Sequence, residues 1–120
     1  KDKELLTRND IDLNLDLSWI DESLVDEIKK LEPFGQQNQK PVFLSKDVLV
    51  IDKVHMGVEG QHLKLLLKKE ESRVHNAIGF GQTSEWSDLS AGDRIDIVYT
   101  LEMNEYNGRR TPQMFIIDIK

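Results

Sequence analysis

The candidate ligand-binding residues of this 120-residue sequence are cationic or ring-bearing side chains in its second half. They are His62, Lys64, Lys68, Arg73, His75, Tyr106, Arg109 and Arg110. Lysine and arginine pair with phosphate groups and aromatic rings stack on nucleobases, so this combination is typical of nucleic-acid binding. Taken singly, each residue is more typical of an ordinary solvated surface. The residue types therefore indicate binding only where the fold gathers them on one face.

Signatures of self-contained catalysis are missing from the sequence. It has no nucleophile elbow, phosphate-binding glycine loop, zinc-protease helix or paired-metal aspartates. His55, His62 and His75 are expected on or beside neighbouring strands, but they lack the close spacing of metal ligands. The absence of cysteine excludes disulfides, thiolate zinc sites and cysteine nucleophiles, and it favours a cytoplasmic location. We predict neither a catalytic residue nor a metal ligand in this segment.

Alternating polar and apolar residues predict five strands. Their expected ranges are 48–56, 62–69, 73–80, 95–103 and 111–119. In the second strand leucines occupy alternate positions and are expected inside, which leaves His62, Lys64 and Lys68 outside. Asn107-Gly108 predicts a type I′ turn between the last two strands, because both central positions of that turn need positive φ. A short irregular link over 83–89 joins the third strand to the fourth.

Five short strands of this length are expected to curl and close, because free sheet edges promote aggregation. The order of three strands, a link and a two-stranded hairpin predicts a mainly β fold, the five-stranded Greek-key barrel of the OB type. An SH3-like barrel is the closest rival, and the link between the third and fourth strands favours the OB-fold. In that fold, Gly79 and Gly81 are expected to give the curved backbone room.

The third strand decides which side chains reach the surface. We expect its larger residues to face inward, namely Val74, Asn76, Ile78 and Phe80. The residues expected outside are Arg73, His75, Ala77 and Gly79. Together with the outer residues of the second strand and the loop from Tyr106 to Arg110, they predict a shallow, locally basic track. OB-folds bind single strands across this face and between these loops.

The first quarter of the chain differs from the rest in charge. The formal net charge is −6; residues 1–32 hold 10 acidic and 5 basic side chains, and residues 33–120 hold 12 and 11. Alternation predicts a strand over 11–17 and i, i+4 spacing predicts a helix over 22–31, stopped by Pro33. The segment 31–43 has turn composition. We therefore predict that residues 1–32 are the tail of a preceding domain with its linker, and that residues 33–120 are the barrel.

Two of the predicted strands are apolar on both faces. Val48 and Val50 oppose Leu49 and Ile51, and the last strand has the same character. A strand of this kind is usually covered on both sides. The alternative function is therefore a structural or protein-interaction barrel that docks on a catalytic core or a partner protein. Because the chain opens on Lys1 rather than Met, we expect it to be a piece of something longer.

Several ordered blocks of sequence resemble the C-terminal OB domain of RecJ-type single-strand-specific DNA exonucleases. The resemblance covers the chain from about residue 9 to its end. Its blocks are Leu31-Glu32-Pro33-Phe34-Gly35, Asn38, Pro41-Val42-Phe43, His62-Leu63-Lys64-Leu65, Ala77-Ile78-Gly79-Phe80-Gly81, Leu101-Glu102-Met103-Asn104-Glu105-Tyr106-Asn107-Gly108 and Gln113.

The resemblance implies a parent enzyme that degrades single-stranded DNA from 5′ to 3′ in bacterial repair and recombination. It also implies Mn²⁺ or Mg²⁺ held by Asp and His residues of an N-terminal phosphoesterase core, whose motifs this chain lacks. The implied partners are single-stranded DNA and the catalytic core, with a single-strand-binding protein or a helicase as further candidates. No apolar run is long enough to cross a membrane. What carries over to this chain is a binding role.

Overall fold

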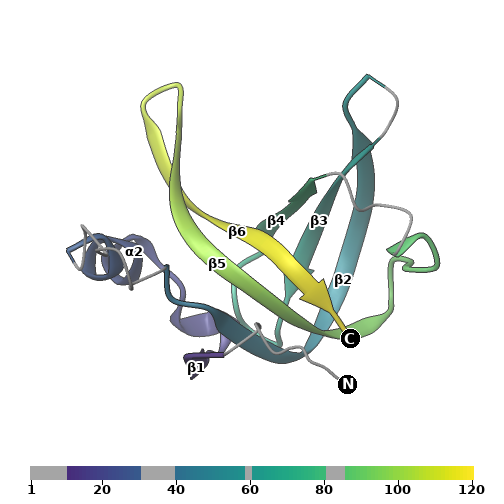
Figure 1. Ribbon diagram of the computed structural model, residues 1–120, viewed down its shortest axis with the longest axis horizontal. Coiled ribbons are helices and arrows are strands. Elements are labelled where there is room, and N and C mark those ends of the chain that lie inside the picture. The colour runs from purple at the N-terminus through teal and green to yellow at the C-terminus, as the bar shows by residue number, and fades with distance from the viewer. Residues whose placement is uncertain (1–10, 31–39, 59–60, 81–85) are drawn as a thin grey trace.

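The computed structural model describes residues 11–30, 40–58, 61–80 and 86–120. Most of these residues form strands (Figure 1). The elements are β1 (Leu13–Asn14), η1 (Leu17–Trp19, a 3₁₀ helix), α2 (Glu22–Lys29), β2 (Phe43–Met56), β3 (His62–Lys68), β4 (His75–Phe80), β5 (Arg94–Tyr106) and β6 (Arg109–Ile119). All five predicted strands are confirmed, and β2 begins earlier than expected. Most of the predicted boundary at 31–43 and the first residues of the link at 83–89 lie outside the described residues.

The five long strands close into a barrel. Their order is β2-β3-β4-β6-β5, and β5 pairs back onto β2. The pairs are antiparallel except for β4 and β6, which run parallel with Ala77 opposite Met114. This closed Greek-key order confirms the OB-fold. Of the helices in the described segments, none is long and apolar enough to span a bilayer.

Strand β2 pairs with both β5 and β3 because it bends along its length. Phe43–Leu49 pair with β5, whereas Leu49–Met56 pair with β3, and irregularities in register fall between 45 and 48 and between 50 and 52. Asp47 has a φ of 56° in the first of these. Its backbone N–H donates to a carboxylate oxygen of Asp96 at 2.9 Å. Bulges of this kind increase strand coiling, which a barrel this small requires.

The barrel core is apolar and is covered at both ends. Leu63, Leu65 and Leu67 are fully buried, as predicted. Near the end of β4, a Cβ added to Gly79 would lie 2.4 Å from the ring of Trp86. The glycine therefore gives room for that ring, which packs against the backbone. Near the start of β4, the other end of the barrel is covered by three buried residues from the N-terminal segment, Leu15, Leu17 and Ile20.

The N-terminal segment is less regular than its alternation predicts. Only Leu13–Asn14 form a strand, which pairs parallel to the start of β2, and Leu13 is 50% exposed. The strand ends early because the carboxylate of Asp16 accepts the backbone N–H of Ser18 at 2.8 Å and starts a 3₁₀ turn. Helix α2 follows with Asp21 as its N-cap.

Buried hydrogen bonds tie this segment to the barrel. The Ser45 hydroxyl donates to the carbonyl of Leu15 at 2.6 Å and also contacts the Tyr99 hydroxyl at 2.7 Å. Burial raises the pKa of Tyr99 above its ordinary value. The division of the chain at residue 32 stays a prediction, although residues 15–25 share the core of the barrel.

Candidate nucleic-acid interface

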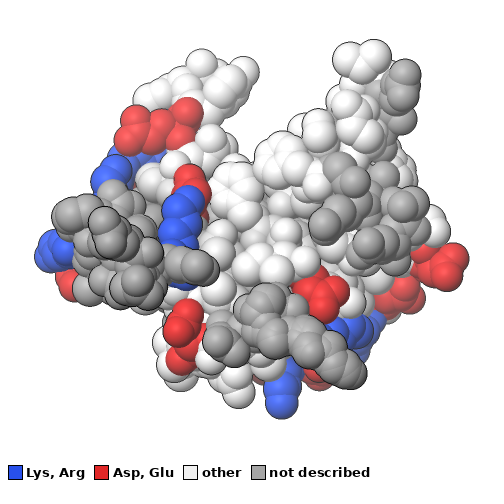
Figure 2. Space-filling view, viewed as in Figure 1, with Lys and Arg blue, Asp and Glu red and all other residues white. Residues whose placement is uncertain are grey.

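Two hairpins project from the same side of the barrel as a pair of arms (Figure 1). In the β2–β3 arm, Lys53–Met56 pair with His62–Leu65. In the β5–β6 arm, Met103–Tyr106 pair with Arg109–Pro112. Figure 2 shows that the surface between the arms is hollowed and dominated by uncharged side chains. The arms and the surface between them form an open channel.

Three rings form a continuous strip on the outer face of β3, β4 and β6. The His62 and Phe80 rings meet edge to face with centroids 5.0 Å apart. The Phe80 and Phe115 rings are stacked, with centroids 6.1 Å apart and an interplanar angle of 20°. Phe80 is 57% exposed. We call these three residues the ring strip, and its exposed faces are suited to stacking with planar apolar groups.

The prediction for the faces of the third strand is wrong from Val74 onward, although Arg73 is exposed as expected. In β4, His75, Ala77 and Gly79 are buried inside the barrel, whereas Val74 and Phe80 are exposed. The register gives the reason: the three inward leucines of β3 are the Cα partners of Gly79, Ala77 and His75. Directly paired residues share a face. Large leucines, together with Trp86 and Leu17, leave room only for small residues at most of these positions.

His75 is therefore an interior residue that closes one end of the core. It is 3% exposed, and its ring Nε2–H donates to the carbonyl of Leu17 at 3.0 Å. Burial lowers the pKa of His75, which favours the neutral ring, although the hydrogen bond acts in the opposite direction. The structure thus excludes His75 from the exposed track in which the sequence placed it.

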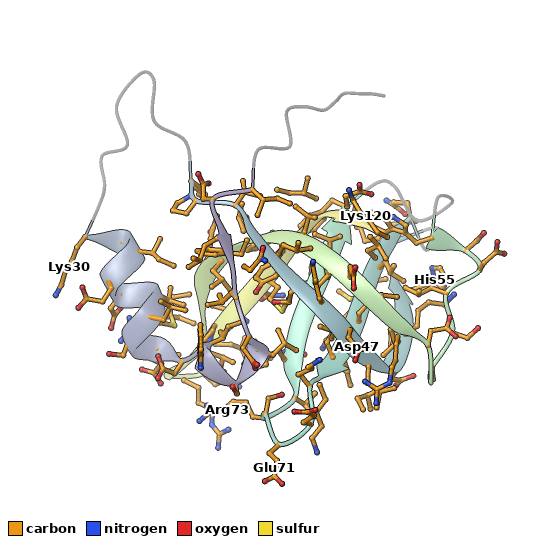
Figure 3. The ribbon with its side chains drawn as sticks, turned by 90° about the horizontal axis from the view of Figure 1, so that it is seen from below. Lys30, Asp47, His55, Glu71, Arg73 and Lys120 are labelled. Carbon is orange, nitrogen blue, oxygen red and sulfur yellow. The ribbon has the colours of Figure 1, made fainter. Side chains whose placement is uncertain are left out.

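Of the remaining candidates on β3 and its following turn, Lys64 lies beside the ring strip, whereas Lys68 and Arg73 lie at and beyond the other end of β3. Lys64 lies on the outer face two positions from His62, and its Cα partner on β4 is Ile78, which in turn pairs with Phe115. It therefore borders the ring strip. Lys68 pairs with Leu49 at the other end of β3. Figure 3 places Arg73 at the turn between β3 and β4, well away from His55 on the β2–β3 arm.

The tip of the β5–β6 arm presents a tyrosine and an arginine. Asn107 and Gly108 have φ of 54° and 78°, which confirms the type I′ turn. Tyr106 is 72% exposed. Arg109 is exposed, and it has no ion pair within the described part of the chain.

Arg110 differs from its neighbour because it is already held by carboxylates. Its guanidinium donates to Asp26 at 2.8 Å and lies 3.6 Å from Glu22 and 3.5 Å from Glu105. The hydrogen bond to Asp26 is the main cause of a raised pKa for Arg110. The two arginines of the arm are therefore in different electrostatic environments.

Sequence reasoning missed two members of the ring strip, Phe80 and Phe115. Alternation predicts Phe80 in the interior, and it gives Phe115 no role beyond membership of the last strand, which is apolar on both faces. Pairing the leucines of β3 with small residues of β4 would have turned Phe80 outward, and the parallel register then places Phe115 beside it. Among the residues that the structure describes, no three His, Asp or Glu side chains are grouped as a metal site.

Comparison with known proteins places this barrel in a family. A model described as the RecJ OB domain matches residues 11–118. The single-stranded-DNA-specific exonuclease RecJ of Bacillus subtilis (strain 168) is 28% identical over 117 residues, which are 98% of this chain and 15% of that protein. The chain thus spans about 15% of the length of this curated relative.

Solved structures share the fold. RecJ of Thermus thermophilus in complex with Mn²⁺ aligns with a TM-score of 0.55 and 22% identity, over 82% of this chain and 14% of that one. The second single-stranded DNA binding protein of Mycobacterium smegmatis aligns with a TM-score of 0.56 and 18% identity, over 66% of this chain and 82% of that one. The resemblance drawn from the sequence blocks is confirmed: the chain belongs to the RecJ OB domain family.

Proposed function

We propose that this chain is the single-stranded-DNA-binding OB module of a RecJ-type exonuclease, and that the strand lies in the channel between the two arms. The observation that carries the proposal is the ring strip of His62, Phe80 and Phe115, which runs from the β2–β3 arm across β4 to β6. The single-stranded DNA binding protein of M. smegmatis shares this fold, which supports the proposal.

The channel provides two kinds of contact. Bases stack on the exposed ring of Phe80 and on the half-buried ring of Phe115, since every base has a π-face and stacking tolerates any sequence. Phosphates pair with Lys64 beside the strip and with Arg109 on the arm. Tyr106 offers a further stacking surface at the arm's tip. Few cations line this path, so we expect stacking to contribute a large share of the affinity.

Removing one ring tests the proposal. The variant Phe80→Ala should bind a fluorescent oligothymidine about tenfold or more weakly in a low-salt anisotropy titration, because stacking contributes about 1–3 kcal/mol per base. Trp19→Ala is the matched control, because Trp19 is a 64% exposed aromatic residue on η1, near the opposite end of the barrel. Thermal unfolding of both variants checks that the fold is kept. Equal losses of affinity in the two variants would place the strand elsewhere.

The activity of the parent protein follows from its relatives and is part of the proposal. We infer a bacterial, cytoplasmic enzyme that degrades single-stranded DNA from 5′ to 3′ in repair and recombination. Its Mn²⁺ or Mg²⁺ is bound in a catalytic core outside this chain, as the Mn²⁺ complex of T. thermophilus RecJ supports for that relative. In this arrangement the OB module holds the strand, and hydrolysis takes place in the core.

A second candidate function is docking of the barrel on the catalytic core or on another protein, such as a single-strand-binding protein or a helicase. Exposed Trp19 favours it, because this ring lies away from the ring strip and lines a pocket of about 270 Å³ with Leu15, Leu44 and Val48. The Trp19→Ala variant separates the two candidates: docking depends on this ring, whereas DNA binding does not.

A further inference from the structure

The guanidinium of Arg110 links helix α2 to the β5–β6 arm. Arg110 of β6 donates to Asp26 at 2.8 Å and lies 3.6 Å from Glu22, both on α2. Glu105, its Cα partner on β5, adds a third carboxylate at 3.5 Å. Three carboxylates therefore surround one positive charge, and the surroundings of Arg110 carry an excess of negative charge. Figure 2 shows acidic and basic side chains intermixed along this arm.

The acids of α2 are held in place by the packing of the helix. Val25, between Glu22 and Asp26, is buried in the barrel core, and Leu24 and Ile28 pack against it. Glu22 and Asp26 are four residues apart, so they lie on one side of the helix and reach Arg110 together. The packing of α2 on the barrel therefore holds both carboxylates beside Arg110.

A carboxylate and a phosphate engage a guanidinium in the same way, each accepting N–H groups from its planar fork. We propose that Glu22 and Asp26 compete with the phosphates of a bound strand for Arg110, so that α2 restrains the affinity of the β5–β6 arm for single-stranded DNA. This inference rests on the proposed function. It divides the two arginines of the arm: Arg109 is available to a ligand, and Arg110 becomes available only when α2 releases it.

The restraint is adjustable because the pairs are exposed. The side chains of Arg110 and Asp26 are 41% and 45% exposed, and ion pairs of this kind contribute little to stability. A phosphate of a bound strand can therefore replace a carboxylate of α2. The effect of α2 on binding should be visible as a change in affinity and in its salt dependence.

The test neutralises the two acids of α2. The variant Glu22→Gln/Asp26→Asn should bind oligothymidine about three- to tenfold more tightly at low salt, because it frees one cation for a phosphate, and its log–log salt slope should steepen by about 0.7. Glu27→Gln/Asp88→Asn is the matched control: it removes the same charge from exposed positions that do not contact Arg110. The control should change affinity less than about twofold, since distant exposed charges are screened.

Arg110→Gln shows whether the gain passes through the guanidinium. In that background the Glu22→Gln/Asp26→Asn substitutions should give no gain, and a gain that persists there, or that the control also shows, overturns the proposal. An NMR titration of the Arg110 guanidinium N–H groups with pyrophosphate gives a readout without DNA, and the acid-neutralised variant should respond at lower pyrophosphate concentrations than the wild type. A response together with no oligothymidine binding by any variant means that the proposed function fails and the competition stands. Oligothymidine binding with no gain in affinity, together with the same pyrophosphate response in the wild type and the acid-neutralised variant, means that the proposed function stands and the competition fails.

Discussion

At the scale of single residues, Phe80 is the member of the ring strip that the sequence pattern placed on the wrong face, and His75 is the candidate that it wrongly exposed. The alternation of residues predicted the inner and outer faces of β3 correctly, because leucine and lysine differ strongly in polarity. It failed for β4, where His75 and Phe80 are both compatible with either face. The register with β3 and the bulk of Trp86 decide between them, and both depend on residues distant in the sequence. The signal available in the sequence was the difference in size between the leucines of β3 and the small residues Ala77 and Gly79 of β4, which can pair on the inner face.

His75 makes the stability of the fold depend on pH. Burial lowers its pKa below the ordinary value of 6.5, so the unfolded chain binds a proton more readily than the folded one. The stabilising effect of the neutral ring is complete above about pH 6.5 and is lost as the pH falls from there through the lower pKa of the folded state. We expect the free energy of unfolding to decrease over that range, by at most about 1.4 kcal/mol per pH unit from this group.

Chemical denaturation between pH 5 and pH 8 measures this contribution. His75→Gln keeps a donor for the carbonyl of Leu17 but has no titrating ring, so its unfolding free energy should vary less with pH than that of the wild type. The same pH dependence in both proteins would show that the destabilisation arises elsewhere.

At the scale of elements, the two arms and the strip between them bring together cations that are far apart in the chain. Lys64 comes from β3, and Arg109 comes from the start of β6. The type I′ turn and the strands were readable from the sequence, because Asn-Gly and strict alternation are local signals. The bend of β2 and the ring contacts were not, because they arise from barrel closure.

Charge reversal on both arms tests this arrangement. Lys64→Glu/Arg109→Glu should weaken oligothymidine binding at low salt by more than about tenfold, because two phosphate contacts become repulsive. The control Lys30→Glu/Lys120→Glu makes the same change in net charge at exposed positions outside the channel, at the ends of α2 and β6. Equal weakening in both variants would mean that net charge, not the channel, governs binding.

At the scale of the whole molecule, the acidic first quarter of the chain is part of the structure of the barrel. Leu15, Leu17, Ile20 and Val25 are buried in the same core as the strands. Burying an aliphatic side chain stabilises a fold by about 1.5–3 kcal/mol, so four of them approach the whole stability of a small domain. The family match beginning at residue 11 agrees with this packing.

Truncation therefore tests the predicted division at residue 32. A chain of residues 33–120 should unfold at a much lower temperature than the full chain, or lose cooperative unfolding, because one end of its core is uncovered. A chain of residues 11–120 is the control and should keep most of the stability. Equal melting temperatures for the full chain and residues 33–120, by circular dichroism, would show that the barrel is complete without the N-terminal segment.

The position of β6 between β4 and β5 also constrains when the barrel can fold during synthesis. The barrel cannot close until β6 has left the ribosome, since β6 lies between β4 and β5 in the ring. Until then the leucine face of β3 and the free edge of β4 are uncovered. Pairings between residues this distant in sequence form slowly. The nascent chain therefore passes through a stage in which apolar surface and an unpaired strand edge are exposed, and such species are prone to aggregation.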